Sequence, residues 1–407
     1  MSPATTVLTA IDATIAWQEE LYRHLHQNPE LSMQEAETAA EVTRRLESFG
    51  YAVQQIGGGV VGVLDNGPGA TVLFRADMDA LPVEETTGLP YASTRTSVDA
   101  EGVTVPVMHA CGHDLHITAG LGAAEILSRN RDAWSGTYIA LFQPGEETAQ
   151  GARSMVDDGL VDKVPTPDVA FGQHVLAFPE AGKVGTTGGP ILSTGACIRV
   201  KAWGKGSHGS MPHLGVDPVL LAAAIVQRLQ GIVSREIAPT QFGVVTVGSL
   251  QAGFKANIIP DHATLLLNIR AYETEVREQL LSAIERIVTA ECEASNSPKP
   301  PEIELYEPFP LTANDEATNA RVTEAFRAFF GEDRVVQMPP MPASEDFSTI
   351  PNAWGIPYTY WGFGGFTPEM NALPNHNAAF APAIQPSLRT GTEAAVVAAL
   401  AYLGKAE

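Results

Sequence analysis

Cysteine, histidine and glutamate side chains, which are common ligands of transition metals, gather at a few points of this sequence. The densest group is residues 108–116, in which Gly112 separates Cys111 from His113. This spacing is too short for one helix face, but a tight turn at a glycine lets both side chains hold one metal ion. Taken alone, the group also fits a buried thiol and packed histidines.

Three further groups follow predicted strands or lie near the end of the chain. They are Glu146 and Glu147 after residues 137–142, His174 after residues 168–172, and His376. Adjacent glutamates can divide the work of hydrolysis, since one binds metal while the other carries the proton of a metal-activated water. One thiolate, three imidazoles and one carboxylate are enough for two divalent ions bridged by the thiolate. This donor set favours zinc and leaves cobalt, nickel and manganese open.

Other charged side chains near these groups have predicted supporting roles. Asp77 and Asp79 follow a predicted strand and are placed to orient a metal-bound histidine, although capping of a turn explains them equally well. Asp114 is the predicted N-cap of an apolar helix. His24 and His26 lie on the first predicted helix, where we expect them to be packed or solvated rather than catalytic.

The composition excludes several classes of function. The 407 residues are 44% hydrophobic and 18% charged, which is typical of a globular protein of two or three domains. The formal net charge of −22 is unfavourable for binding nucleic acid or an anionic membrane, and an anionic substrate needs a local basic anchor. Three cysteines make no disulfide framework, and we find neither a signal peptide nor an apolar run long enough to span a membrane. We therefore expect a cytoplasmic protein.

The pattern of predicted elements indicates two domains, one inserted into the other. Strands and helices alternate over residues 1–190 and again over 309–407, which is typical of a wound α/β sheet. Residues 191–308 read strand-helix-strand-strand-helix-strand, the order of a ferredoxin-like α+β unit. We predict a mixed-sheet catalytic domain, with its polar groups at the carboxyl ends of the strands, and an inserted lid or dimerisation domain.

These motifs resemble a known family. The chain is similar to the dinuclear metallo-aminoacylases and carboxypeptidases, specifically the branch of hippurate hydrolases, plant indole-acetyl-amino-acid hydrolases and bacterial acylglutamine aminoacylases. The resemblance covers nearly the whole chain, and together its motifs are highly specific. In order they are RADMDALP at 75–82, HACGHD at 109–114, QPGEE at 143–147, QHV at 173–175, GKGSHG at 204–209 and SEDF at 344–347.

The resemblance implies a role for each candidate residue. Two divalent metal ions would be bound by Cys111 as the bridge, together with His113, Glu147, His174 and His376. Glu146 would be the general base and then the acid. On the inserted domain, His208 would hydrogen-bond the oxyanion, while Asn257 and Arg270 would hold the substrate's carbonyl and carboxylate groups. A fixed guanidinium suits a carboxylate, although an ordinary ion pair within the strand explains Arg270 equally well.

The expected activity is hydrolysis of the amide bond of an N-acyl-L-amino acid, which releases a carboxylic acid and a free amino acid. A dipeptidase or carboxypeptidase needs the same two-metal chemistry and differs only in its pocket. A cysteine hydrolase using Cys111 and His113 would leave Glu147, His174 and His376 without a task. A non-catalytic metal-binding protein has no use for Glu146.

The inserted domain is also expected to form a homodimer. Its predicted sheet has an exposed edge strand, and pairing of two copies covers that edge in a two-fold, isologous interface. His208 lies far along the chain from the metal ligands, so it must reach the carbonyl by domain closure or from a partner subunit. The resemblance favours the partner.

Overall fold

A computed structural model describes residues 3–405, and the chain divides into two compact units. Unit 1 contains the chain through Ile191, Ala313–Pro339 and the chain from Asp346; unit 2 contains Leu192–Thr312 and Pro340–Glu345. The short segment Pro340–Glu345, which we expected in the catalytic domain, therefore belongs with unit 2. None of the helices that the structure describes is long and apolar enough to cross a bilayer.

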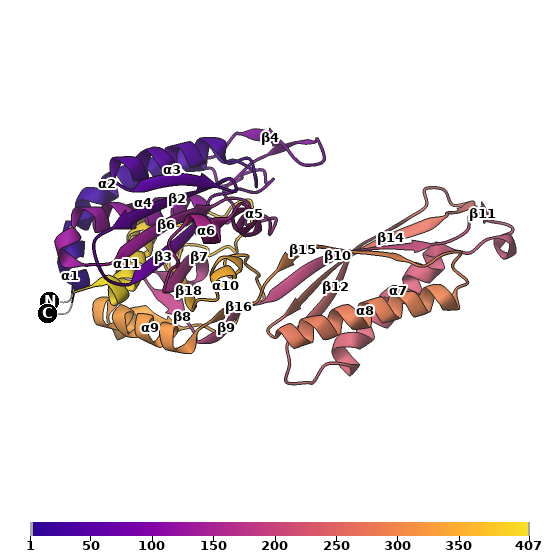
Figure 1. The fold of residues 1–407 in the computed structure, drawn as a ribbon. Coiled ribbons are helices and arrows are strands. Elements are labelled where there is room, and N and C mark those ends of the chain that lie inside the picture. The colour runs from indigo at the N-terminus through magenta and orange to yellow at the C-terminus, as the bar shows by residue number, and fades with distance from the viewer. Residues whose placement is uncertain (1–2, 406–407) are drawn as a thin grey trace. The chain divides into compact units, whose positions relative to one another are not determined.

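Unit 1 is built on an eight-stranded mixed sheet (Figure 1). In spatial order its strands are β1 (Ala52–Ile56), β2 (Gly59–Asp65), β6 (Thr137–Gln143), β3 (Thr71–Asp77), β7 (Val169–Ala181), β18 (Tyr358–Gly364), β8 (Val184–Thr186) and β17 (Val335–Gln337). Strand β3 runs parallel to β6 and β7, and β18 runs parallel to β7, so these four strands end at the same edge. The mixed α/β class predicted from the sequence is confirmed.

Helices and short strands complete unit 1. The helices are α1 (Pro3–Val7), α2 (Ile11–Gln27), α3 (Ala36–Ser48), α4 (His113–Arg129), α5 (Gly151–Asp157), α6 (Leu160–Lys163), α9 (Glu316–Phe330), α10 (Thr349–Trp354) and α11 (Ile384–Leu403). Strands β4 (Thr96–Val98) and β5 (Thr104–Pro106) form a hairpin, and β9 (Gly189–Leu192) and β16 (Thr312–Asn314) lie where the chain passes between the units.

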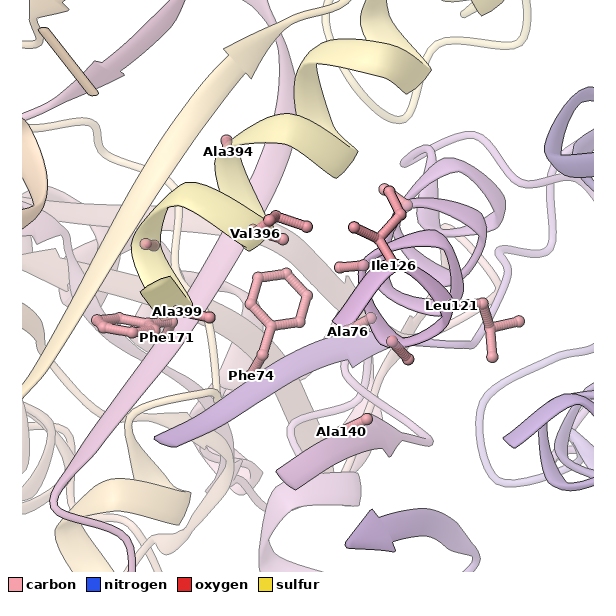
Figure 2. Close-up of a cluster of buried hydrophobic side chains, with 14 of the residues drawn as sticks. Phe74, Ala76, Leu121, Ile126, Ala140, Phe171, Ala394, Val396 and Ala399 are labelled. Carbon is pink, nitrogen blue, oxygen red and sulfur yellow. The ribbon is translucent and has the colours of Figure 1, made fainter. Parts of the chain in front are cut away.

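Successive side chains of β3 point alternately to the apolar core of unit 1 and to a buried polar face. Phe74 and Ala76 point to the apolar side, where they pack with residues of α4 and α11 such as Ile126 and Val396 (Figure 2). Successive side chains of a strand point to opposite faces, so Arg75 between them faces the other side. There Arg75 is fully buried and forms ion pairs, which a buried guanidinium requires.

Unit 2 has the predicted ferredoxin-like order. Its elements are β10 (Thr194–Trp203), α7 (Pro218–Arg235), β12 (Gly243–Ala252), β14 (His262–Ala271), α8 (Thr274–Ala294) and β15 (Glu302–Phe309), with the short pair β11 (Ser207–His208) and β13 (Ile258–Ile259). The sheet is antiparallel in the order β12-β14-β10-β15, and both helices pack on it through an apolar core. Asp217 is the N-cap of helix α7, and its carboxylate accepts a hydrogen bond from Val219 N at 2.8 Å.

Three local predictions were wrong. Helix α4 begins at His113 with Gly112 at its N-cap, so Asp114 lies inside the first turn and its carboxylate instead contacts His26 Nδ1 at 2.7 Å. Strand β7 does not end at residue 172 but continues to Ala181, so His174 lies within it. We also expected a helix to open at residues 344–347, but α10 begins later, at Thr349.

Candidate active site

The turn before α4 brings Cys111 and His113 to the same place. Gly112 has a φ of 84°, and a Cβ there would lie 2.4 Å from Val175 Cγ1, so only glycine fits this close contact with β7. The turn therefore packs directly on the strand that carries His174. Cys111 Sγ lies 3.4 Å from His174 Nε2 as a result.

The turn after β6 carries Glu146 and Glu147. Its two ends touch at Gly151, where a Cβ would lie 1.5 Å from the carbonyl oxygen of Pro144. Glu147 N donates to Asp79 Oδ2 at 3.0 Å, which ties the turn to the end of β3. Both carboxylates are thereby placed at the edge where the parallel strands end.

The loop that carries His376 is hydrogen-bonded to the turn before α4 and to strand β7. His376 N donates to the carbonyl of Ala110 at 2.8 Å. The preceding Asn375 donates its amide to the carbonyls of Cys111, at 3.1 Å, and Val175, at 3.2 Å. Asn375 is a positioning residue that the sequence reading missed, although its place next to a predicted ligand was a signal.

The five predicted metal ligands form two groups that share one atom. Cys111 Sγ lies with nitrogens of His113 and His174 in one group, and with Glu147 and His376 in the other, all within 4.8 Å in each group. Thiolate, imidazole and carboxylate donors are those that zinc and its neighbours bind. The arrangement therefore fits two ions bridged by Cys111.

The carboxylate of Glu146 lies beside this pair of groups. It lies within 4.8 Å of His113 and Glu147 ligand atoms and is buried. Glu146 thus forms a third group with His113 and Glu147, and its carboxylate is near enough to exchange a proton with water bound at the two groups that share Cys111.

Neighbouring groups contact Nδ1 of two of these histidines and leave Nε2 directed to the other predicted ligands. His113 Nδ1 contacts the carbonyl of Asp79 at 2.8 Å and its Oδ1 at 3.2 Å, and His174 Nδ1 contacts the carbonyl of Val175 at 2.7 Å. Carbonyl and carboxylate acceptors of this kind orient metal-bound histidines. Nε2 of His113 and Oε1 of Glu147 are buried without a hydrogen-bond partner, which suits atoms that bind a cation.

The local charges also fit bound cations. Burial lowers the pKa of His113, but Asp77 and Asp79 outweigh it and raise the pKa to about 10, so protons compete with metal for this nitrogen. Burial, followed by the charges of Glu147 and Glu146, raises the pKa of the Cys111 thiol well above its ordinary value. A divalent ion would supply the positive charge that a thiolate needs here.

His116 belongs to the support of this site and not to the ligands. Its Nδ1 contacts Asp77 Oδ1 at 2.6 Å, and its Nε2 accepts from Val175 N at 2.8 Å, so neither nitrogen remains for a metal. No role for His116 is predicted from the sequence. Its position one helical turn after His113 was the available signal, because side chains three apart share a helix face.

The three predicted residues of unit 2 lie at two different places. His208 on β11 is opposite Ile258, and the carbonyl of Asn257 accepts from Gly209 N at 2.9 Å, so His208 and Asn257 are neighbours on exposed backbone. Arg270 lies at the other end of β14, opposite Gly195, where its guanidinium contacts Asn268 and Ser344. Strand β13, which pairs with β11, ends three residues before His262, so His208 lies at the start of β14, and about 27 Å of strand separates His262 from Arg270.

His208 is held in one tautomer. Ser210 N donates to its Nδ1 at 3.1 Å, and Ser210 Oγ lies 2.7 Å from the same atom. An Nδ1 that accepts a backbone N–H places the proton of the neutral ring on Nε2. The outward-facing nitrogen is therefore a hydrogen-bond donor.

Comparison with known proteins identifies the family. The model of peptidase family M20/M25/M40 matches residues 73–400. The chain belongs to this family. It is 36% identical over 80% of its length to an N-acetyl-L-cysteine deacetylase of Bacillus subtilis, of which 75% is covered. It is 35% identical over 89% of its length to thermostable carboxypeptidase 2 of Saccharolobus solfataricus, of which 90% is covered.

A solved structure of the M20 family shows the same fold. It is a dinuclear metal-binding peptidase from Bacillus subtilis, with a TM-score of 0.77 and 27% identity over 96% of this chain and 98% of that one. With the family model and the paired ligand groups, this likeness makes the chain a metal-dependent amidohydrolase with a dinuclear site.

Proposed function

We propose that this M20 enzyme hydrolyses the amide bond of N-acyl-L-amino acids, with Cys111, His113, Glu147, His174 and His376 as its metal ligands. The observation that carries the proposal is the pair of ligand groups that meet at Cys111, with the Glu146 carboxylate beside them. The deacetylase activity named for the Bacillus subtilis relative supports the substrate class.

The roles of the residues follow from their positions. When bound, the two ions would lower the pKa of water and polarise the scissile carbonyl. Glu146 takes the proton of the attacking water and later delivers it to the departing α-amine, so one carboxylate serves both steps. His208 donates from Nε2 to the oxyanion of the tetrahedral intermediate, a contact that is stronger in the transition state than in the ground state.

We further propose that His208 and Asn257 serve the site of a partner subunit. Arg270 suits the substrate carboxylate, because its guanidinium is oriented by Asn268 and Ser344. Since roughly 27 Å of β14 separates the Arg270 end from the His208 end, one small N-acyl amino acid cannot touch both residues of the same chain. In a dimer, one chain would supply Arg270 to the substrate and the other would supply His208 and Asn257.

The two edges of the unit 2 sheet support a homodimer through β12. The outer strand β15 carries Glu302, Glu304 and Glu307, charges that discourage pairing with another strand. Strand β12 at the opposite edge has no charged residue in its ten. The neighbouring helix α7 also exposes Val219 and Leu220, with 46% and 72% of their surface accessible. Pairing of two β12 strands would cover this edge in an isologous dimer.

Zinc is the proposed metal, because a bridging thiolate and three imidazoles suit it, while manganese, cobalt and nickel remain candidates. A thiolate ligand must also stay reduced, which suits the cytoplasm. A carboxypeptidase activity is the second candidate, supported by the name of the Saccharolobus relative. Both activities cleave an amide next to a free carboxylate and differ in the group on the acyl side.

The test is a substrate panel measured with defined metals. Protein stripped by a chelator and reloaded with zinc, manganese, cobalt or nickel would be assayed for amine release from N-acyl amino acids and dipeptides. We expect turnover of N-acyl amino acids that disappears on chelation and returns with metal. Faster turnover of dipeptides would favour the carboxypeptidase, and activity unaffected by chelation would contradict both.

A further inference from the structure

Glu35 occupies the N-cap position of α3 but makes no capping hydrogen bond to its own helix. The neighbouring Glu30 caps α3 instead, accepting from Glu37 N at 3.0 Å and Thr38 N at 2.8 Å. One oxygen of Glu35, Oε1, accepts from two other amides, Met33 N at 2.9 Å and Gly145 N at 2.8 Å. Glu35 thus joins its segment to a turn 110 residues away.

The second of these amides, Gly145 N, belongs to the turn that carries Glu146, the proposed general base. Gly145 precedes Glu146, and its own carbonyl accepts from Gly151 N at 3.0 Å within the turn. The peptide bond on its other side is held by Glu35. The same segment supports the metal-binding half of the turn, because Ser32 Oγ donates to Asp79 Oδ2 at 2.6 Å and Asp79 accepts from Glu147 N.

This arrangement buries a carboxyl group and places a non-glycine residue in a left-handed conformation, neither of which is required to cap a helix. Glu35 is only 5% exposed, and burial, followed by the charge of Asp79, raises its pKa to about 8. Met33 has a φ of 63°, an unusual backbone conformation for a residue with a side chain, and 41% of its surface is exposed. Residues with unusual backbone conformations, such as Met33, are found mainly where the surrounding structure fixes the backbone for function.

We propose that Glu35 is a positioning residue for the general base: by accepting from Gly145 N it fixes the turn and thereby the direction of Glu146. The inference rests on the proposed function, because the activity measured is hydrolysis of an N-acyl amino acid. Glu35 touches no reacting atom and acts through the backbone alone. A neutral acceptor of the same shape should therefore replace it.

Three variants test this role. Glu35→Met keeps the volume and removes the acceptor, so kcat should fall about 10- to 100-fold, the scale of a small misplacement of a catalytic group. KM should change less than about twofold, and both metal ions should remain bound, because no ligand is touched. Glu35→Gln retains an acceptor oxygen and should keep kcat within about threefold of the unaltered enzyme.

Glu30→Ala is the matched control. It removes a carboxylate from the same segment and destabilises the start of α3, but it leaves Gly145 N untouched. If Glu35 were merely structural, Glu35→Met and Glu30→Ala would lower kcat per folded, metal-loaded molecule equally, and the proposal would be overturned. A loss of kcat in Glu35→Gln equal to that in Glu35→Met would also overturn it.

Hydrogen exchange of the unaltered protein provides a second test if Glu35→Met does not fold. The Gly145 amide should exchange slowly, because it is bonded to a buried acceptor, and a rapidly exchanging amide would refute the contact. Failure of the proposed function is distinguishable, since it would appear as an unaltered enzyme without turnover whatever residue stands at position 35.

Discussion

The proposed metal ligands of unit 1 and the proposed substrate residues of unit 2 differ in how firmly the chain holds them. His113 and Cys111 are buried: His113 Nδ1 contacts the carbonyl of Asp79 just after β3, and the carbonyl of Cys111 accepts from Asn375 in the loop of His376. His208 and Asn257 lie on exposed backbone at the end of a small sheet, with a short contact to Ser210 as the main restraint on His208. The fold therefore holds the first region from several sides, whereas the second is exposed and held by few contacts.

The difference follows from the chemistry of each region. Two cations need several donors at fixed distances, and only buried, hydrogen-bonded side chains give that precision. An oxyanion donor has to approach a substrate that must first enter, so it is better placed on a separate surface. Changes in unit 1 should therefore affect metal content and stability, whereas changes at His208 should affect only turnover.

The largest effect is expected at Cys111. Cys111→Ala removes the atom that both ligand groups share, so the protein should lose metal, and turnover should fall at least about 1000-fold, since the ions supply several kcal/mol of transition-state stabilisation. Metal analysis and amine release measure the two losses. Cys292→Ala, at a buried thiol on α8 of unit 2, is the control and should keep both. A Cys111→Ala protein with two ions would refute the bridge.

The two adjacent glutamates should separate metal binding from proton transfer. Glu146→Gln should keep both ions while kcat falls about 100-fold or more, the scale of general-base catalysis. Glu147→Gln should instead weaken metal binding, which titration with zinc would detect. The opposite pattern would exchange the two roles.

Much of this candidate site was predictable because its residue types and spacings are recognisable in the sequence. Cys111, His113 and the glutamate pair stand in short motifs, and the strands before them show as apolar runs, so the edge of the sheet could be inferred without coordinates. Strand β1 was missed because its sequence, AVQQI, is half polar and lacks a clear alternation.

The supporting contacts were not predictable, because each joins residues far apart in the chain. Asp114 looked like a helix cap, yet its partner is His26, 88 residues earlier. The separation of His208 from Arg270 depends on strand register, which no local pattern in the sequence reports. Sequence motifs thus gave the proposed ligands, which the fold brings together, while the residues that contact them could be found only from the fold.

A smaller effect is expected at His208. Replacement by alanine should lower kcat about 100-fold, the scale of losing one oxyanion donor. The exposed ring makes no core contact, so the free energy of unfolding should change by less than about 0.5 kcal/mol, and both ions should remain. Denaturant unfolding and metal analysis of the same sample check this. Loss of metal would contradict the division between the units.

The smallest effect is expected at His26, which contacts Asp114 in the first turn of α4. Burial lowers the pKa of His26, but Asp114 and Glu85 outweigh it and raise the pKa to about 10, against 6.5 ordinarily. A raised pKa means that the folded state binds the proton more tightly, so this stabilisation is complete below about pH 6.5 and is lost as the pH rises towards 10. Between pH 7 and 8 it should decrease by about 1 kcal/mol.

Urea unfolding of metal-loaded protein at several pH values measures this loss. The difference in stability between the unaltered protein and His26→Gln should narrow as the pH rises. A difference independent of pH would show that His26 is neutral in the folded protein. His24→Gln, on the same helix, is the control and should leave the pH dependence unchanged.

The most direct test of the account is to mix two inactive proteins, His208→Ala and Glu146→Gln, and allow their subunits to exchange. If unit 2 of one chain completes the metal site of the other, each mixed dimer has one site with both lesions and one with neither. Random exchange makes half of the dimers mixed, so about a quarter of the unaltered activity should return. Confirmed exchange without recovery, or a protein that is monomeric while active, would contradict the assignment of His208 to the partner's site.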